Sequence, residues 1–152
     1  MSLKDTITEG IQGAMKAQDK VRLETLRSIK KGLLEKEVSV RPSGQTELTE
    51  EQELDVLSQV AKQRRDSIEQ YQKAHRDDLA QQEAQELAIV EEFLPQQLSD
   101  AEVAAVIEQI IAQVGASSAK DMGKVMGAAM QQLKGKADGK KVQASVKAKL
   151  GG

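Results

Sequence analysis

The chain of 152 residues has no cysteine and no tryptophan, and its only aromatic residues are Tyr71 and Phe93. Without cysteine, disulfide bonds, thiolate metal sites and cysteine nucleophiles are all excluded. Without aromatic bulk, the core must be built from Leu, Ile, Val, Ala and Met, which suits the packing of helix against helix. Only two prolines occur, Pro42 and Pro95, so each one is a useful boundary marker.

A long apolar run is also missing. No segment approaches the ~20 apolar residues that a helix needs to span a bilayer. The N-terminus has no apolar core of the kind found in secretory signal peptides. Hydrophobic residues make up 39% of the chain and charged residues 30%, which is typical of a folded globular protein. We therefore expect a cytoplasmic protein without membrane association.

Apolar residues recur at helical spacing along the chain, and no stretch alternates as a strand would. Before Pro95 this spacing predicts four helices, with one connection at residues 39–48 and another near His75. The second helix should end near Val38. The fourth should end at Leu94, because the residue before a proline is pushed out of helical geometry. Residues with N-cap chemistry precede the four helices: Ser2, Asp19, Thr49 and either Asp77 or Asp78.

Three more helices are predicted after Pro95. A capping box of Ser99 and Glu102 opens the first, and Gly115 closes it. The second carries a stripe that includes three methionines, which we expect to fill the core rather than to form an exposed groove. Gly135 stands where a left-handed residue would end this helix, and Asp138 stands where a cap would open the last one.

The spacing assigns an inner face to each predicted helix. The residues expected there are Leu3, Ile7, Ile11, Met15, Leu23, Leu26, Ile29, Leu33, Leu34, Leu54, Leu57, Ala61, Ile68, Tyr71, Leu79, Leu87, Val90, Val103, Val106, Ile107, Ile110, Val114, Met122, Val125, Met126, Ala129, Met130, Leu133, Val142, Val146 and Leu150. The predicted fold class is therefore all-α. We expect a four-helix N-terminal domain over residues 1–95 and a small, basic three-helix tail domain over residues 96–152.

Charge is distributed unevenly between these parts. The formal charge is +2 over residues 1–40, −7 over 41–95, −3 over 96–114 and +6 over 115–152. A basic end on an acidic chain indicates a polyanionic partner. A solvated lysine face on small helices would give the same count, so charge alone leaves both interpretations open.

Several stretches together resemble a known family. They are residues 19–27, Glu83–Leu87, Phe93–Leu98, Lys120–Met126 and Leu133–Gly139 with Val142. The chain is similar along essentially its whole length to YqeY-type proteins of the GatB/YqeY family. Its end resembles the tail domain of the B subunit of glutamine-dependent tRNA amidotransferases. The resemblance implies a helical domain, a three-helix tail, and a connection to tRNA-dependent amidation, the family's carbon–nitrogen ligase activity with glutamine as amido-N-donor.

The sequence itself shows none of the parts that catalysis of that kind requires. It has no Gly-x-Ser-x-Gly elbow for a serine nucleophile and no phosphate-binding loop of the Gly-x-x-x-x-Gly-Lys type. His75 stands alone in a polar connection, where an exposed turn residue is a better interpretation than a metal ligand or general base. We therefore expect no catalytic residues, no cofactor and no metal, and association with an amidation system in place of catalysis by the chain alone.

Two other charged groups have alternative interpretations. The acidic residues of the fourth helix suggest a solvated helix face rather than paired catalytic carboxylates. The arginines of the third helix and of its end could form an anion site, but neighbouring acids favour local ion pairs. These groups are Glu83, Glu86, Glu91 and Glu92, and Arg64, Arg65 and Arg76.

The tail lysines are the main candidate site. Lysines that have no aromatic residues between them suit contacts with phosphates. A protein with such a surface would recognise the shape and backbone of an RNA rather than its bases. Free N–H groups at the start of the last helix would add to such a site. The candidate RNA-binding residues are Lys120, Lys124, Lys134, Lys136, Lys140 and Lys141, and the residues expected to shape the turn are Gly123, Gly135, Asp138 and Gly139.

Two functions are compatible with these observations. The first is a non-catalytic, tRNA-associated binding module, with the tail lysines as the contact surface. The second is a protein–protein interaction module that acts on a translation or amidotransferase component.

Overall fold

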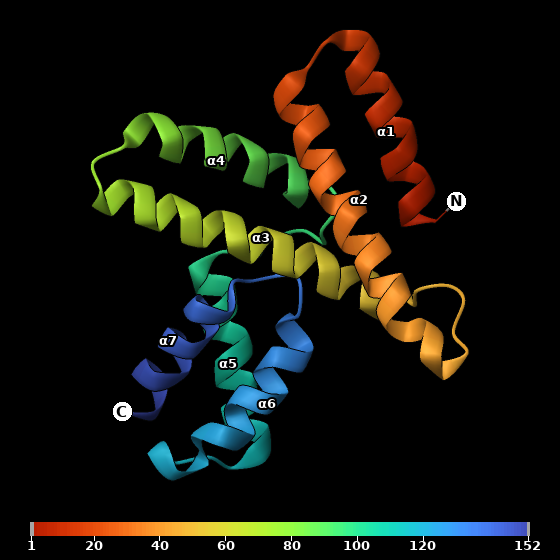
Figure 1. Cartoon of the computed structure of the whole chain (residues 1–152). Helices are drawn as coiled ribbons and strands as arrows, with labels where there is room; N and C mark the ends of the chain where they lie inside the picture. The colour runs from red at the N-terminus through yellow and green to blue at the C-terminus, as the bar shows by residue number, and fades with distance from the viewer. Residues whose placement is uncertain (1, 152) are drawn as a thin grey trace. The chain divides into compact units, whose positions relative to one another are not determined.

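The computed structural model describes residues 2–151, which are helical or connecting segments (Figure 1). Seven α-helices and two 3₁₀ segments occur in these residues and no strand does, which confirms the all-α prediction. Across the described residues, no helix combines the length and the apolar character that crossing a membrane requires. The elements are α1 (Leu3–Ala17), α2 (Lys20–Val40), η1 (Arg41–Ser43), α3 (Glu50–Lys73), α4 (Asp77–Glu91), α5 (Asp100–Val114), η2 (Ala119–Asp121), α6 (Met122–Leu133) and α7 (Gly139–Leu150).

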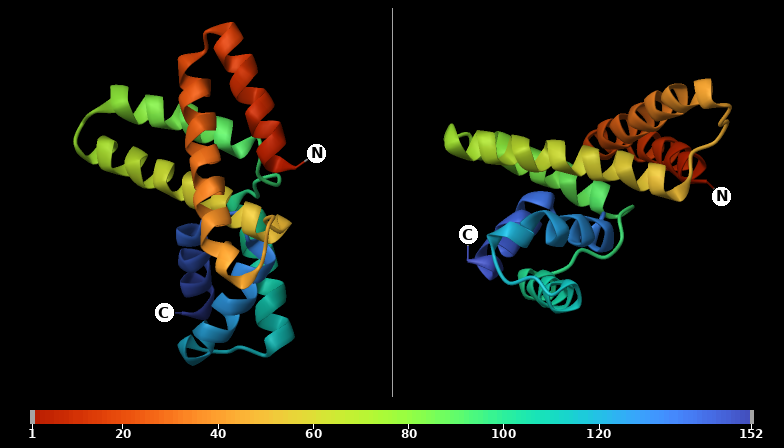
Figure 2. Two further views of the ribbon diagram at one scale, coloured as in Figure 1. Left: turned by 45° about the vertical axis from the view of Figure 1, so that its right-hand side comes forward. Right: turned by 90° about the horizontal axis from the view of Figure 1, so that it is seen from below.

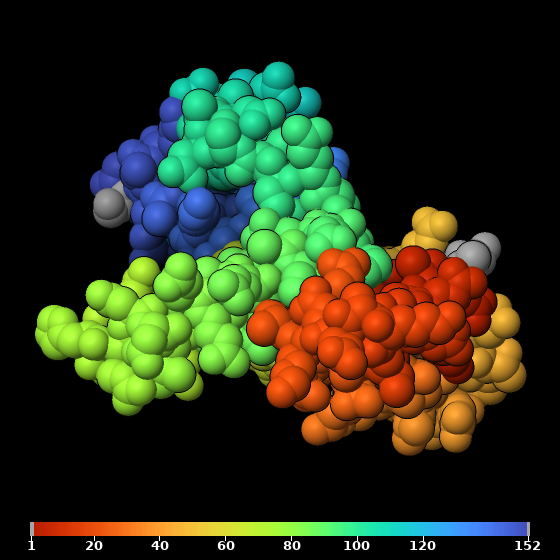
Figure 3. All heavy atoms as spheres, turned by 90° about the horizontal axis from the view of Figure 1, so that it is seen from above, coloured from red at the N-terminus to blue at the C-terminus, as the bar shows by residue number. Residues whose placement is uncertain are grey.

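The chain divides into two compact units, Met1–Leu94 and Pro95–Gly152. In the first unit, α1 packs along α2 and α3 packs along α4, as two helical hairpins (Figure 2). Because α2 also packs against α3 and α4, it joins the two hairpins. The far end of the α3–α4 hairpin extends beyond α1 and α2 (Figure 3, yellow-green). The buried core of this unit consists of Ile7, Leu26, Ile29, Leu33, Val56, Leu57, Val60, Ala61 and Val90.

Side-chain caps fix most of the helix starts. Ser2, Thr49 and Ser99 form capping boxes with the residues three positions later, and Asp19 caps α2. The expected cap of α4 was wrong. Arg76 is its N-cap residue and makes no side-chain cap bond, while Asp77 and Asp78 lie in the first turn. Carboxylates stabilise that turn through the helix dipole instead.

Two helix ends also differ from the prediction. α2 continues to Val40 and runs into the 3₁₀ segment η1, so only part of residues 39–48 is an irregular loop. α4 ends at Glu91, before Phe93 and Leu94. Both residues instead pack against the core from the connection that follows the helix. The proline therefore limits the helix without marking its last residue.

Some predicted inner-face residues lie on the surface. Met15 is 55% exposed, whereas Ala14 is buried. A Cβ at Gly10 would lie 3.0 Å from Cδ1 of Leu26, so α2 lies against the face of α1 that carries Ile7, Gly10 and Ala14. Steps of three and of four residues both fit a helical stripe, and only the partner helix decides between them. Leu34, Val114 and Met130 are exposed as well.

On α3 the buried positions are only in part those that the spacing predicted. Val56 and Val60 are buried along with Leu57 and Ala61, while Leu54, Ile68 and Tyr71 are half-buried. The reason is the close approach of α2, because a Cβ at Gly32 would lie only 2.9 Å from Cγ1 of Val56. This contact turns the valine edge of α3 toward α2.

The second unit is built from α5, α6 and α7 around its own core. Met122 and Met126 pack against this core and are half-buried, whereas Met130 is 45% exposed. The methionine stripe therefore fills the core only in part. The buried residues are Val103, Ile107, Ile110, Val125, Ala129, Leu133, Val142, Val146 and Leu150.

Candidate nucleic-acid interface

The turn between α6 and α7 carries four of the six candidate lysines. Gly135 has φ of 74°, in the left-handed region that favours glycine. Asp138 caps α7, and its carboxylate accepts a 3.2 Å hydrogen bond from the backbone N–H of Lys140. Gly139 is the first residue of α7, and the end of Met130 lies over it. Gly123, expected to shape the turn, lies inside α6 instead.

The capping carboxylate changes the predicted role of this helix start. The expectation was that free N–H groups of α7 would bind a phosphate. Asp138 already occupies that position with a negative charge, so an anion there would be repelled. The lysine side chains around the turn, rather than the backbone N–H groups, therefore carry its capacity for phosphate.

A short segment before α5 holds the turn in place. The side-chain amide of Gln97 donates to the carbonyl oxygen of Gly135 at 2.7 Å. The backbone N–H of Leu98 donates to the carbonyl oxygen of Lys136 at 2.9 Å, and the Leu98 side chain packs against the core. Sequence reasoning did not assign a role to either residue. The only signal was that both belong to the Phe93–Leu98 stretch shared with the family.

Two ion pairs define how the helices run. Lys141 of α7 lies 3.3 Å from Asp100 of α5, and Lys149 pairs with Glu108. The second pair lies eight positions after the first on both helices, so α5 and α7 are parallel. Because α6 connects them, it runs in the opposite direction (Figure 1).

The candidate lysines therefore form two groups rather than one patch. Lys120 and Lys124 lie at the start of α6, and the turn lysines follow its end. The 12 residues of α6 separate these groups by about 18 Å at 1.5 Å per residue. Because α6 and α7 are antiparallel, Lys147 in the last turn of α7 lies toward the end of the hairpin that carries Lys120 and Lys124. The sequence analysis did not select this residue.

Comparison with known proteins places the chain in a family. The family model described as "Yqey-like protein" matches residues 4–150. The chain belongs to the YqeY-like family. The predicted resemblance to YqeY-type proteins is thus confirmed for nearly the whole chain.

Curated relatives of this YqeY-like protein come from yeasts. A Lachancea thermotolerans protein named "Altered inheritance of mitochondria protein 41, mitochondrial" is 30% identical over 114 residues, which are 74% of this chain and 59% of that protein. A Kluyveromyces lactis protein of the same name is 32% identical over 87 residues, 57% of this chain and 45% of that protein. The chain thus spans about three-fifths or less of the length of these relatives.

The lysines of the second unit differ in whether a carboxylate lies close enough to form an ion pair with them. Residues 95–152 hold eight lysines and five acidic residues, a formal charge of +3. Lys141 and Lys149 are matched by carboxylates of α5. Lys134 and Lys140 make interactions of their own. Among residues 2–151, no ion pair is formed by the exposed Lys120, Lys124, Lys136 and Lys147.

Asp121 has a local structural role at the start of α6. Its carboxylate accepts a 3.0 Å hydrogen bond from the backbone N–H of Ser117. That bond is the main reason why the pKa of Asp121 is lowered, with smaller contributions from the N–H of Ser118 and the charge of Lys124. The carboxylate is thus directed toward the preceding connection, where it holds the loop.

The arginines of the first unit form ion pairs, as the sequence favoured, but of the three only Arg76 pairs with an acid close to it in sequence. Arg64 lies 3.4 Å from Glu86 and 3.7 Å from Glu83, and its Nη2 donates to Ser28 at 3.2 Å. Arg65 pairs with Glu91 at 3.8 Å. The partners come mainly from α4 rather than from acids adjacent in sequence. Arg76 pairs with Asp78 at 3.2 Å.

The acidic residues of α4 are therefore not a freely solvated face, contrary to the prediction. The side chains of Glu83 and Glu86 are only 20% and 13% exposed, because α4 packs against α3. Burial, followed by the charge of Glu83, raises the pKa of Glu86, and the charge of Arg64 opposes that rise. Glu92 forms an ion pair with Arg22 at 2.9 Å.

His75 occupies the connection before α4 with φ of 57° and is exposed. The left-handed conformation explains why the chain turns there. Within residues 2–151, no group of three His, Asp or Glu side chains is arranged to hold a metal ion. With no metal-binding group in these residues, the chemically distinctive feature is the set of exposed lysines of the second unit that form no ion pair.

Proposed function

We propose that this YqeY-like protein is a non-catalytic RNA-binding module and that its second unit contacts the phosphate backbone of tRNA. The observation that carries this proposal is the set of exposed lysines without ion pairs at both ends of the α6–α7 hairpin. Exposed cations that form no ion pair can exchange their counterions for phosphates. The resemblance to the tail of the amidotransferase B subunit supports tRNA as the RNA and links the module to tRNA-dependent amidation.

The spacing of the two lysine groups bears on the kind of RNA. Groups about 18 Å apart reach phosphates that are several nucleotides apart along a strand, or on two strands of a folded RNA. No aromatic side chain lies in the second unit, so base stacking of the kind used by single-strand readers has no platform there. Folded tRNA should therefore bind more tightly than an unstructured strand of equal length.

A pair of matched double variants tests this proposal. Lys124→Gln with Lys147→Gln removes two charges that form no ion pair within the described residues. Lys141→Gln with Lys149→Gln removes two charges that face carboxylates of α5. Both variants lower the net charge equally, so long-range attraction changes by the same amount. The first should reduce the slope of log affinity against log salt by about 2, and the second by much less.

The assay is titration of tRNA across a salt series, with circular dichroism to show that each variant is folded. An equal loss of tRNA affinity in the two variants would mean that only the overall charge matters, and it would refute the proposed contact surface. Absence of tRNA binding to the unmodified protein at low salt would refute the function itself.

The alternative is a protein-interaction module that docks on a translation or amidotransferase component. The acidic first unit, with a formal charge of −5 over residues 1–94, favours this alternative because it would repel RNA. Co-elution with a purified tRNA amidotransferase after nuclease treatment would support it. We expect no glutamine-dependent release of ammonia from the chain alone.

A further inference from the structure

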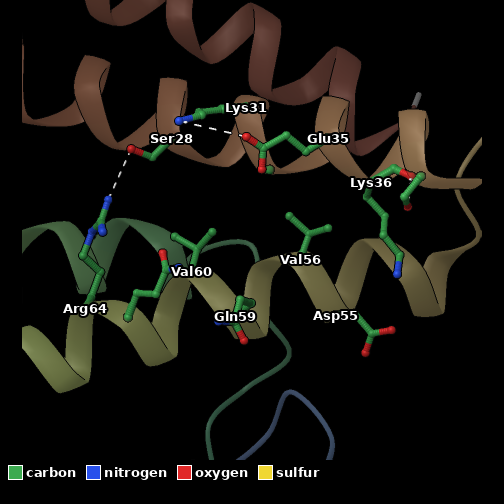
Figure 4. Close-up of a pocket in the computed structure, with 12 residues that line it drawn as sticks. Ser28, Lys31, Glu35, Lys36, Asp55, Val56, Gln59, Val60 and Arg64 are labelled. Carbon is green, nitrogen blue, oxygen red and sulfur yellow. Dashed lines mark hydrogen bonds and ion pairs between the residues drawn. The ribbon is translucent and has the colours of Figure 1, made fainter.

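A groove of about 680 Å³ lies between α2 and α3 in the first unit (Figure 4). Its size falls within the range of about 300–1,000 Å³ that is typical of binding sites. The close approach of Gly32 to Val56 lies within this groove, which both residues line. Neither the lysine surface of the second unit nor the family comparison assigns a role to this groove.

The groove has an apolar floor and a basic side chain at each end. Val56 and Val60 point from α3 toward α2 and form the floor with Gly32 (Figure 4). Lys36 reaches down from α2 at one end, and Arg64 reaches up from α3 at the other. Arg64 donates to Ser28, which lies eight residues before Lys36 on α2, so the two ends are separated by about 12 Å along that helix.

The two ends differ in charge. Lys36 is half-buried and forms no ion pair within the described part of the chain, so a carboxylate would satisfy it. The charge of Arg64 is already matched by two carboxylates of α4. That end therefore favours a neutral hydrogen-bond acceptor, such as an amide oxygen, over a second anion.

The rim of the groove favours a protein partner over a free small molecule. Gln59 and Gln63 place side-chain amides along α3, where they can bond to a peptide backbone.

We propose that this groove binds an extended segment of a partner protein with a defined side-chain pattern. An acidic residue pairs with Lys36, an apolar residue two positions along covers the valine floor, and an Asn or Gln two positions further accepts from Arg64. Alternate residues of an extended chain share one face, so all three side chains point into the groove. The first and last of these residues are four positions apart, and at about 3.3 Å per residue an extended chain covers about 13 Å between them. This matches the separation of the two ends of the groove.

Other charged groups also lie on the rim. Glu35 lies 4.0 Å from Lys31, and Asp55 has an interaction of its own. Among the described residues that line the groove, Lys36 is the cation that forms no ion pair.

The test uses fluorescein-labelled peptides that contain Glu-Ser-Leu-Ser-Gln between Gly-Ser flanks, in this order and in the reverse order. Binding to the full chain is followed by fluorescence polarisation. One of the two orders should bind, and replacing its Glu by Lys or its Leu by Ser should weaken binding about tenfold or more, the effect of losing one charge-assisted contact or one buried side chain.

Two variants locate the binding on the protein. Lys36→Glu should weaken binding at least about tenfold, whereas Lys20→Glu, the same charge change at an exposed position at the start of α2, should not. Gln59→Trp should block the groove from an exposed position, with a circular dichroism melt to show that the fold is kept.

The proposal is overturned if neither order binds at millimolar peptide, or if Lys36→Glu and Lys20→Glu have equal effects. It is also overturned if glutarate displaces the peptide at equal concentration, because the groove would then be a small-anion site. Since the peptides contain no phosphate and the groove lies outside the lysine surface, failure here leaves the RNA proposal intact.

Discussion

The close approach of α2 and α3 at Gly32 allows a sharp test of the fold. Replacing glycine by alanine inside a helix normally stabilises it by about 1 kcal/mol. At Gly32 the new Cβ would lie 2.9 Å from Cγ1 of Val56, a stiff and nearly buried side chain. Overpacking of this kind costs about 1–3 kcal/mol, so Gly32→Ala should change the free energy of unfolding by between zero and a loss of about 2 kcal/mol.

Gly13 of α1 is the matched control. It also lies inside a helix, but a Cβ there would meet no atom within 4 Å. Gly13→Ala should therefore gain the full propensity term of about 1 kcal/mol. For a unit of this size, each 1 kcal/mol corresponds to a shift in Tm of about 4–8 °C. The Tm of Gly13→Ala should rise, and the Tm of Gly32→Ala should stay unchanged or fall.

The assay can follow the first unit alone. Tyr71 on α3 is the only tyrosine and the chain has no tryptophan, so intrinsic fluorescence during unfolding reports on that helix. If Gly32→Ala raised the Tm as much as Gly13→Ala, the helices could not approach as closely as the structure shows. The origin of the adjoining groove would then need another explanation.

The remaining predictions concern single side chains. Because the pKa of Glu86 is raised, its contribution to stability is fully present below the ordinary value of 4.5 and is lost as pH rises through the raised pKa. Glu86→Gln should therefore raise the Tm at neutral pH, and a gain that persisted below pH 4.5 would contradict this. Asp138→Ala removes the cap of α7 and should cost the second unit about 1 kcal/mol in chemical unfolding. Gln97→Ala should cost about 1 kcal/mol and alter the amide NMR signals of Gly135 and Lys136, because the turn loses a hydrogen bond. Arg76→Ala should leave the Tm unchanged, since its ion pair with Asp78 is exposed, and a large loss would show a role that the structure lacks.

Helix number and order could be predicted because they depend on local patterns. The capping residues Ser2, Thr49, Ser99 and Asp138 act within their own turn, so the sequence suffices to place them. The same holds for Gly135, whose left-handed backbone follows from the end of an apolar stripe. The prediction for the cap of α4 was wrong because two successive aspartates fitted the N-cap position, and neither of them is the N-cap residue.

The candidate site was less predictable. The sequence identifies the tail lysines by count, but it cannot show that Lys141 and Lys149 meet carboxylates of α5. It likewise treats Glu83 and Glu86 as surface residues, although α3 covers them and supplies Arg64. Ion pairs across helices depend on which helices pack, and no local pattern contains that information.

By itself, the sequence determined the all-helical class, most helix starts, the absence of cysteine chemistry and the membership in the YqeY-like family. The first three follow from residue type or from contacts within about one turn of helix, and the family follows from a match along residues 4–150. The tertiary structure decided which face of α1 is buried, how closely α2 approaches α3, and which lysines remain without a carboxylate. These features arise between residues far apart in the chain, where steric fit and charge pairing select one of several arrangements that the local pattern permits equally.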